Sequence, residues 1–338
     1  MTFKKSMRGP MMKAKLKKNI NQILKKSKKK MYSFLDGNGQ ILMFHRIVEK
    51  ESNLQLNDIE ATVDDVEYVI KYFLDKDYLI ISLDQVYDFL TSKIKFNKKF
   101  VVFTFDDGYK DNYTLAYPLF KKYNAPFTIY LTTGFPNQTI KMWWYGLNDL
   151  INKSERIDFE YNGIPYLYNL KNQTEKISAW NDLHNLIMSK GFDRDLLFEK
   201  IFLQNNIDLE NYRKDMALTW TELEILSADP LVTIGAHTIN HHNSVNLTPN
   251  QLVNEIKGSK DEIEEFLKIK VHHFAFPYGG RKHANKREIQ IAENLGFKTV
   301  VTTRFNHVIK ILHKNNITLP RVELNHEIIE KEIRNKSK

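Results

Sequence analysis

The 338-residue chain contains no cysteine, which excludes disulfide scaffolds, cysteine-ligated zinc, iron–sulfur clusters and thiol nucleophiles. It also lacks any run of about 18 apolar residues, the length that a membrane-spanning helix requires. Hydrophobic residues at 42%, aromatic residues at 12% and charged residues at 27% are ordinary globular values, so wholesale disorder, collagen and coiled coil are excluded as well. The length allows one large α/β domain or two small ones.

Acidic residues are absent from the first 30 residues, and this absence accounts for the net charge of +9. Twelve of the 50 Lys and Arg residues lie there, so the other 308 residues carry 38 basic and 41 acidic side chains. Leu16, Ile20, Ile23 and Leu24 fall at helical spacing between these lysines. The arm, residues 1–35, is interpreted either as a basic amphipathic helix for an anionic membrane surface or as a disordered tail. No apolar signal region follows the lysines, so we expect a cytoplasmic protein.

Beyond residue 36, short apolar runs alternate with amphipathic stretches, which is typical of β/α repeats. The runs are mostly continuous, as expected for strands buried on both faces in a parallel sheet or barrel. Seven strands are predicted, at Gln40–Phe44, Tyr78–Ser82, Phe100–Phe105, Pro126–Leu131, Leu231–Ala236, His272–Phe276 and Lys298–Thr302. Helices are predicted at Val63–Leu74, Asp84–Leu90, Asp111–Tyr123, Thr221–Ser227, Pro249–Leu267 and Lys286–Leu295.

One segment, about residues 134–216, breaks this rhythm. It is rich in Asn, Lys, Tyr and Trp, and Tyr161-Asn162-Gly163-Ile164 within it has the pattern of a hairpin turn. Because a structureless loop of this length is rare in a compact domain, we predict a folded insertion that forms a lid or side subdomain. The chain then divides into the arm at 1–35, one domain at 36–330 that carries the insertion, and a tail at 331–338.

Polar residues or a tight turn follow five of the seven predicted strands. In a β/α barrel the active site forms at this end of the strands, so these residues are expected to converge. They are His45, the run Asp106-Asp107-Gly108, the run from His237 to His241, the turn Pro277-Tyr278-Gly279, and the pair Thr303-Arg304.

Asp106 and Asp107 place two adjacent carboxylates at the end of a buried strand, where both ionise comfortably only beside a cation or hydrogen-bond donors. His237 and His241 are spaced i, i+4, which puts two imidazoles on one side of a helical turn. Two histidines and one aspartate leave the open coordination positions that a catalytic Zn²⁺ requires. Each pattern alone is more often a loop, a helix cap or a surface coincidence, but their convergence at strand ends favours a metal site.

Three motifs resemble those of the polysaccharide deacetylases, the NodB-homology group of carbohydrate esterases. They are TFDDGY at Thr104–Tyr109, GAHTINH at Gly235–His241 and FAFPYG at Phe274–Gly279. The resemblance covers roughly residues 38–325 outside the insertion. It implies a distorted (β/α)7 barrel and a metal-dependent enzyme that removes N-acetyl groups from a sugar.

The resemblance also implies roles for individual residues. Asp106, the first aspartate of the pair, corresponds to the general base, while Asp107, His237 and His241 correspond to the metal ligands. The backbone N–H of Tyr278 corresponds to a donor of the oxyanion hole. The implied cofactor is Zn²⁺ or another divalent metal such as Co²⁺, Ni²⁺ or Mn²⁺, because a site of two histidines and one aspartate accepts several.

The chain departs from the family pattern in two places. The usual acid is a histidine in a C-terminal Leu-x-His motif, which reads Leu319-Pro320-Arg321 here. Deacetylases of poly-N-acetylglucosamine supply the acid from a Tyr-His pair at the end of the first strand, and Phe44-His45 is similar, so His45 is assigned as the acid. The arginine that orients the base is replaced by Ala275, and either Arg304 or Arg321 is left to take its place.

Arg304, Arg321, Trp143 and Trp144 are also the candidates for contact with the substrate, although a Trp-Trp pair is as often local core of an insertion. We therefore expect an N-deacetylase of an acetylated sugar in bacterial surface-polysaccharide synthesis. The cytoplasmic prediction and the basic arm point to a lipid-linked or nucleotide-linked sugar at the inner face of the membrane. An O-deacetylase, a deacetylase of a non-sugar amide and a non-catalytic glycan-binding protein stay open as alternatives. Nucleic acid is not an expected partner, because the chain outside the arm is nearly neutral.

Overall fold

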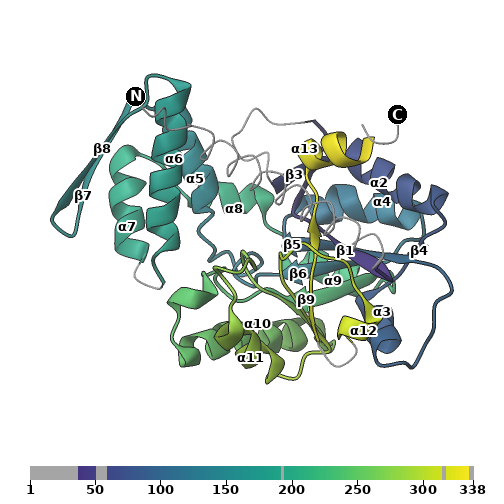
Figure 1. Ribbon diagram of the computed structural model, residues 1–338. Helices are drawn as coiled ribbons and strands as arrows, with labels where there is room; N and C mark the ends of the chain where they lie inside the picture. Colours follow the sequence, from purple (N-terminus) through teal and green to yellow (C-terminus); the bar gives the residue numbers. More distant parts are fainter. Residues whose placement is uncertain (1–36, 51–58, 192–193, 314–316, 335–338) are drawn as a thin grey trace, which may run out of the picture.

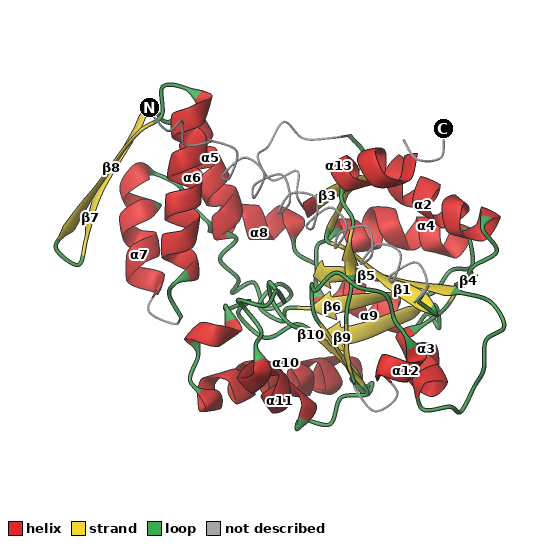
Figure 2. Cartoon of the chain, in the orientation of Figure 1, coloured by secondary structure: helices red, strands yellow, loops and turns green. Residues whose placement is uncertain are grey.

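A curled parallel sheet forms the centre of the molecule (Figures 1 and 2). The computed structural model describes residues 37–50, 59–191, 194–313 and 317–334. The strand order in the sheet is β12-β11-β10-β9-β6-β5-β1-β13, and β4 pairs with β5 outside this path. The strands are β1 (Gly39–Phe44), β4 (Leu79–Ile80), β5 (Phe100–Asp107), β6 (Phe127–Leu131), β9 (Val232–Ala236), β10 (His273–Ala275), β11 (Thr299–Val301), β12 (Thr318–Leu319) and β13 (Val322–Glu323).

The sheet closes on itself through β12 and β13. These strands stand at opposite ends of the strand order, yet only Pro320 and Arg321 separate them in the chain. Leu319 is in register with Val301 of β11, and Val322 is in register with Leu42 of β1. Because one short stretch of chain pairs with both edges, the edges must meet. The fold is therefore a distorted (β/α) barrel, as the sequence predicted.

All seven predicted strand regions contain a strand, but one of them is not a full strand of the barrel. The strand predicted at Tyr78–Ser82 is reduced to the two residues of β4, which pair only with the first residues of β5. The barrel is instead completed by β12 and β13, which were not predicted. Each has two residues, and the proline between them cannot donate a ladder hydrogen bond, so this stretch has no strand-like pattern.

The predicted helices are present and cover the outside of the barrel. They are α2 (Val63–Asp75), α3 (Leu83–Leu90), α4 (Tyr117–Lys122), α9 (Trp220–Ser227), α10 (Pro249–Leu267) and α11 (Lys286–Glu293). The prediction at Asp111–Tyr123 divides into a wide π-type turn, η2 (Asn112–Ala116), and α4. Capping boxes start α2, α3, α9, α10 and α11, so the local sequence fixes where these helices begin.

Buried apolar residues fill both faces of the sheet. Outward-facing side chains such as Phe44, Phe103 and Phe105 pack against the helices, and Phe105 meets Phe120 of α4 edge to face at 5.6 Å. Inward-facing side chains such as Val102 and Val301 fill the barrel. This packing holds the carboxyl ends of β5 and β9, which carry two of the three sequence motifs, in fixed positions.

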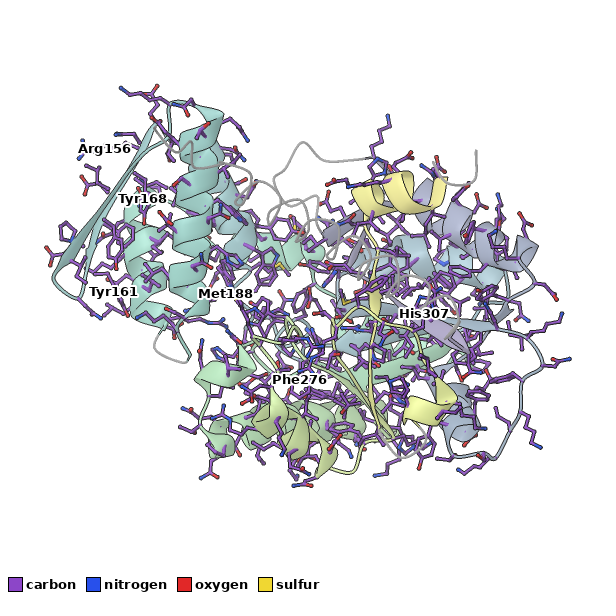
Figure 3. All side chains as sticks on the ribbon, in the orientation of Figure 1. Arg156, Tyr161, Tyr168, Met188, Phe276 and His307 are labelled. Carbon is purple, nitrogen blue, oxygen red and sulfur yellow. The ribbon has the colours of Figure 1, made fainter. Side chains whose placement is uncertain are left out.

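Residues 143–216 form a separate lobe beside the barrel, at the left in Figure 1. Its elements are α5 (Trp143–Lys153), the hairpin β7 (Arg156–Tyr161) and β8 (Ile164–Asn169), α6 (Gln173–Met188), α7 (Arg194–Ile201), η3 (Leu203–Asn205) and α8 (Glu210–Met216). A buried cluster that includes Leu150, Leu183 and Leu197 gives the lobe its own core. Figure 3 shows Tyr161 and Tyr168 on its hairpin, far from Phe276 in the barrel.

Short elements complete the chain: β2 (Arg46–Val48) and β3 (Glu60–Thr62), which pair with each other, and η4 (Ser244–Asn246), α12 (Lys310–His313), α13 (His326–Ile328) and η5 (Ile329–Arg334). Residues 331–334 of the expected tail belong to η5, and Arg334 forms an ion pair with Asp65 at 3.0 Å. The basic arm lies outside the described residues. In the part of the chain that is described, no helix combines the length and the apolar character needed to cross a membrane.

Candidate active site

The end of β5 delivers Asp106 and Asp107 to the mouth of the barrel, with both side chains buried. Asp107 has a φ of +79° and Gly108 a φ of +104°. A positive φ is costly for a residue with a Cβ, and such strained residues gather at functional sites. Thr238, His241 and Tyr278, on the facing loops, also have positive φ. The loops that carry these residues therefore adopt strained backbone conformations, and they face one another at the mouth of the barrel.

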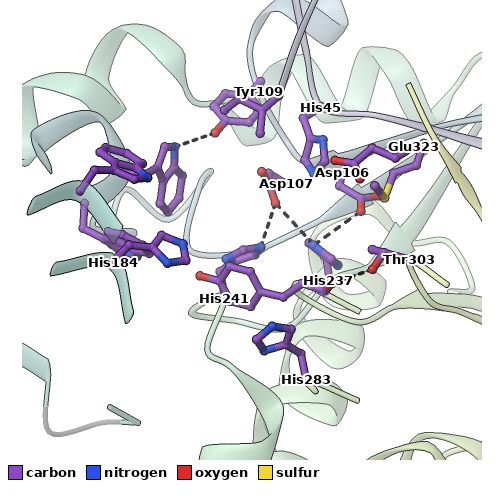
Figure 4. A pocket seen from close by; sticks show the side chains of 16 residues that line it. His45, Asp106, Asp107, Tyr109, His184, His237, His241, His283, Thr303 and Glu323 are labelled. Atoms are coloured by element: carbon purple, nitrogen blue, oxygen red, sulfur yellow. Dashed lines mark hydrogen bonds and ion pairs between the residues drawn. The ribbon is translucent and has the colours of Figure 1, made fainter. Parts of the chain in front are cut away.

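Asp107, His237 and His241 form a cluster in which their ligand atoms lie within 4.8 Å of one another. Asp107 Oδ1 is 3.4 Å from His237 Nε2 and 3.1 Å from His241 Nε2 (Figure 4). Although burial alone raises the pKa of Asp107, the two imidazoles hold it well below its usual range. Burial lowers the pKa of His241, which favours the uncharged imidazole that a metal ligand must be.

The donor set of this cluster fits a metal ion. His237 Nδ1 lies 2.8 Å from the carbonyl oxygen of Ala275, which can only accept, so Nδ1 carries the hydrogen and Nε2 presents a lone pair toward Asp107. Asp107 Oδ1 is buried and forms no hydrogen bond with any described residue. A lone pair facing an unpaired carboxylate oxygen is unfavourable unless a cation lies between them.

Glu255 of α10 holds the loop that carries His241. Its carboxylate accepts hydrogen bonds from Ile239 N at 3.1 Å and from Asn240 N at 2.9 Å, and from the Asn240 side-chain amide at 2.7 Å. From the other side Arg194 Nη2 donates to the Asn240 carbonyl at 2.8 Å. Asn240, the residue before His241, is therefore held from two sides, by Glu255 of the barrel and by Arg194 of the lobe.

Asp106 lies outside this candidate metal site and is held by Arg321. Its two carboxylate oxygens accept from Arg321 Nη1 and Nη2, both at 2.6 Å, and Oδ2 lies 4.0 Å from His237 Nε2. Burial alone raises the pKa of Asp106, but the charge and hydrogen bonds of Arg321, together with the neighbouring His237, bring it below its ordinary value. Asp106 is thus a buried, ionised and fixed carboxylate beside the cluster.

His45 follows β1 and lines the same cavity as the two aspartates. Two residues hold the backbone on either side of this histidine: Asn112, the first residue of η2, and Asp111, which precedes η2. Asn112 Nδ2 donates to the His45 carbonyl at 2.9 Å, and Asp111 accepts from Ile47 N at 2.9 Å and from Arg46 Nε at 2.8 Å. Figure 4 shows the imidazole above Asp106 and Asp107, on the side away from His241.

Tyr278 lies in the turn after β10, with a φ of +61°. Its ring packs edge to face on His241, with the ring centroids 4.8 Å apart. Its carbonyl accepts from Thr303 Oγ1 at 2.8 Å. Its backbone N–H forms no hydrogen bond with another described residue, so this donor is available at the edge of the site.

A cavity of about 390 Å³ joins these groups. The barrel supplies His45, Asp106, Asp107, His237, His241 and Tyr278, and the lobe supplies Trp143, Trp144, Trp180 and His184. The Trp144 indole N–H donates to Tyr109 OH at 3.0 Å (Figure 4), which ties the lobe to the residue that follows Gly108. The two tryptophans singled out in the sequence therefore face the cavity, although Trp143 is almost fully buried.

The two arginines singled out as substrate contacts lie elsewhere. Arg321 is fully buried and both of its terminal nitrogens contact Asp106, so it orients that carboxylate and has no surface left for a ligand. Arg304 does not line the cavity and donates instead to the carbonyl of Ala284. Trp180, His184 and Glu323 line the cavity but were not predicted, because nothing in the local sequence marks them.

Comparisons with known proteins concern the family and the fold. The sequence model described as "Polysaccharide deacetylase" matches residues 93–183 and 198–300, more than half of the chain. YxkH of Bacillus subtilis strain 168, whose name links it to the polysaccharide deacetylases, is 35% identical over 91 residues, which cover 27% of this chain and 30% of that protein.

Three solved structures share the fold. The Streptococcus pyogenes deacetylase PplD, solved with acetate, has a TM-score of 0.56 at 20% identity and aligns over 87% of this chain and 96% of its own. IcaB from Ammonifex degensii has a TM-score of 0.55 at 17% identity, over 87% and 94%. The de-N-acetylase from Aggregatibacter actinomycetemcomitans has a TM-score of 0.55 at 16% identity, over 88% and 98%.

Proposed function

Because the chain belongs to the polysaccharide deacetylase family, we propose that it is a metal-dependent N-deacetylase that releases acetate from an acetylated glycan. The observation that carries this proposal is the pair of neighbouring but distinct sites at the end of β5. Asp107 faces two histidines, while Asp106 is kept ionised by Arg321 and stays free of that cluster. Metal-dependent hydrolysis of an amide uses a metal site together with a separate base.

Asp107, His237 and His241 would hold the metal. A divalent metal bound there supplies a Lewis acid for the acetyl carbonyl and lowers the pKa of the attacking water toward about 7. Zn²⁺ suits this donor set, and Co²⁺, Ni²⁺ or Mn²⁺ are compatible with it.

The remaining groups move protons and stabilise charge. Asp106 accepts a proton from the attacking water, and Arg321 fixes the direction in which its oxygens point. The Tyr278 backbone N–H donates to the oxyanion that develops on the acetyl oxygen. His45, on the opposite side of the carboxylates from His241, donates a proton to the departing amine, which an imidazolium can do at neutral pH.

A glycan-binding protein is the weaker alternative. Binding alone gives no reason to bury an ionised carboxylate against an arginine beside a histidine cluster, because such a charge is costly to desolvate. An O-deacetylase or a deacetylase of a non-sugar amide would use the same chemistry and would differ from the proposed enzyme in its substrate.

The proposed substrate is an acetylated sugar of bacterial surface-polysaccharide synthesis, in lipid-linked or nucleotide-linked form. The basic residues 1–30 support a place on the inner face of the cytoplasmic membrane, because lysines between apolar residues favour anionic lipid surfaces. Deletion of residues 1–30 is expected to abolish partition onto anionic vesicles, and unchanged partition would contradict this part of the proposal.

The deciding experiment measures acetate release by the full, metal-loaded chain from N-acetylated and O-acetylated sugars in free, nucleotide-linked and lipid-linked form. We expect release from N-acetylated substrates, and a fall of at least ~100-fold in Asp106→Asn and in His45→Ala with bound metal unchanged. His272→Ala, at the opposite end of the barrel where β10 begins, is the matched control and should keep full activity.

Each other result has a definite meaning. Release that survives His45→Ala would refute the assignment of the acid alone. Release from O-acetylated sugars only would identify an O-deacetylase. No release from any substrate by a protein that retains its metal would overturn the proposed activity.

A further inference from the structure

Helix α6 of the lobe presents two aromatic side chains to the catalytic cavity. Trp180 and His184 are four residues apart and so lie on one face of the helix. Both are half-buried and both line the cavity that contains Asp107. The neighbouring stripe of the same helix, which includes Ala179 and Leu183, is fully buried in the core of the lobe. Trp180 packs against the edge of this core and also lines the cavity, so it lies at the boundary between the two.

A row of rings connects this helix face with the metal cluster. The ring centroid of Trp144 lies 5.9 Å from that of His241, and the centroid of Trp143 lies 5.8 Å from that of Trp144. His184 follows at 5.4 Å from Trp143, and Trp180 stacks on His184 at 6.3 Å. Figure 4 shows His184 on one side of Asp107, with His45 and Glu323 on the other. The cavity thus extends from the cluster toward the lobe.

This row is longer than one sugar requires, because a pyranose ring is about as wide as a single aromatic ring. Sugar rings present C–H groups on their faces, and these pack on aromatic surfaces while the hydroxyls at the rim stay hydrogen-bonded. Trp144 lies beside the cluster and is placed to contact the sugar that loses its acetyl group. Trp180 and His184 lie beyond that position.

We propose that Trp180 and His184 form a subsite for a second sugar residue, adjacent to the residue that is deacetylated. This inference rests on the proposed function and specifies its substrate as a glycan of at least two linked sugars. Burial, with the nearby His283, lowers the pKa of His184, so its imidazole is neutral at pH 7. A neutral imidazole both donates and accepts hydrogen bonds, which suits a sugar hydroxyl.

The test compares one N-acetylglucosamine unit with a short β-linked oligomer of the same sugar as substrates of the metal-loaded full chain. We expect Trp180→Ala to lower the oligomer-to-monomer ratio of kcat/KM by about 10-fold. Trp180→Phe should restore most of that ratio, because it keeps an aromatic face. Ile177→Ala is the matched control, since Ile177 lies on the same helix with 48% of its surface exposed and does not line the cavity.

A binding measurement keeps the subsite distinguishable from the activity. The oligomer is titrated calorimetrically into Asp106→Asn, with and without Trp180→Ala. Weaker binding with Trp180→Ala supports the subsite even if no acetate is ever released, in which case only the proposed activity fails. If acetate is released but Trp180→Ala and Ile177→Ala leave the same oligomer-to-monomer ratio and the same affinity, the subsite is refuted and the activity stands.

Discussion

Replacement of Arg321 with methionine is expected to destabilise the folded protein by about 3–5 kcal/mol at neutral pH. Arg321 and Asp106 are both buried and form two hydrogen bonds of 2.6 Å. Methionine fills a similar volume but leaves the carboxylate without a counter-charge. The magnitude is that of breaking a buried ion pair by removing one partner, because the other charge then stays desolvated.

The pH dependence of this loss follows from the pKa of Asp106. In the native protein that pKa lies below the ordinary value of 3.8, so the ionised carboxylate contributes stability that is present above 3.8 and is lost as pH falls through the lowered value. Without Arg321, burial dominates and the pKa rises above 3.8. The variant then gains from protonation, so its deficit relative to the native protein should shrink as the pH is lowered from 7 to 4.

The assay is chemical denaturation of both proteins at several pH values, together with kcat/KM against pH. If Asp106 is the base, the acid limb of the activity profile should move to higher pH in Arg321→Met. Arg304→Met is the matched control, because Arg304 is half-buried and has no carboxylate partner among the described residues. An equal loss of stability in the two variants, or a deficit of Arg321→Met that is the same at pH 4 and pH 7, would refute the reasoning.

Three further predictions concern the metal cluster and its support. Glu255→Gln offers one acceptor oxygen where the loop that carries His241 requires two. Metal affinity, measured by chelator competition, should therefore fall about 10–100-fold. Unchanged affinity would contradict the role of Glu255. Metal at 100 times its Kd should stabilise the native protein by about 2.7 kcal/mol in thermal denaturation but not Asp107→Asn; equal stabilisation would place the metal elsewhere. Gly108→Ala should cost at least ~1 kcal/mol, since φ is +104° and the added Cβ would lie 2.5 Å from Leu131 Cδ1; a neutral effect would show that this turn relaxes.

The parts of the fold that carry a strong local pattern could be predicted from the sequence. The buried strand β5 begins with the nearly continuous apolar run Phe100–Phe105, and the helix Pro249–Leu267 begins at a capping box that is visible in the sequence. The closing strands could not be predicted, because two residues on each side of a proline have no periodicity to detect. Their pairing is decided by the curvature of the whole sheet.

Some residues of the candidate site could likewise be predicted from the local sequence, and others could not. Asp107, His237 and His241 lie shortly after the ends of predicted strands, so the rule that parallel strands end at one edge is enough to bring them together. Trp180 and His184 reach the cavity only through the packing of the lobe against the barrel. A Trp and a His four residues apart on a helix can line a cavity or pack into a core, and a single sequence does not distinguish these two cases.

The choice between Arg304 and Arg321 also depended on the closure of the barrel. Arg304 follows β11 and turns toward Ala284, whereas Arg321 lies where the chain passes from β12, beside β11, to β13, beside β1. From there its guanidinium reaches Thr104 Oγ1 at 3.2 Å and Asp106 on β5, and Nε donates to the carbonyl of Thr302 at 3.3 Å. Arg321 therefore links the two edges that meet at this point. Because Ala275 stands where the family pattern has its arginine, an arginine still faces Asp106, but it comes from the link between β12 and β13 and not from β10.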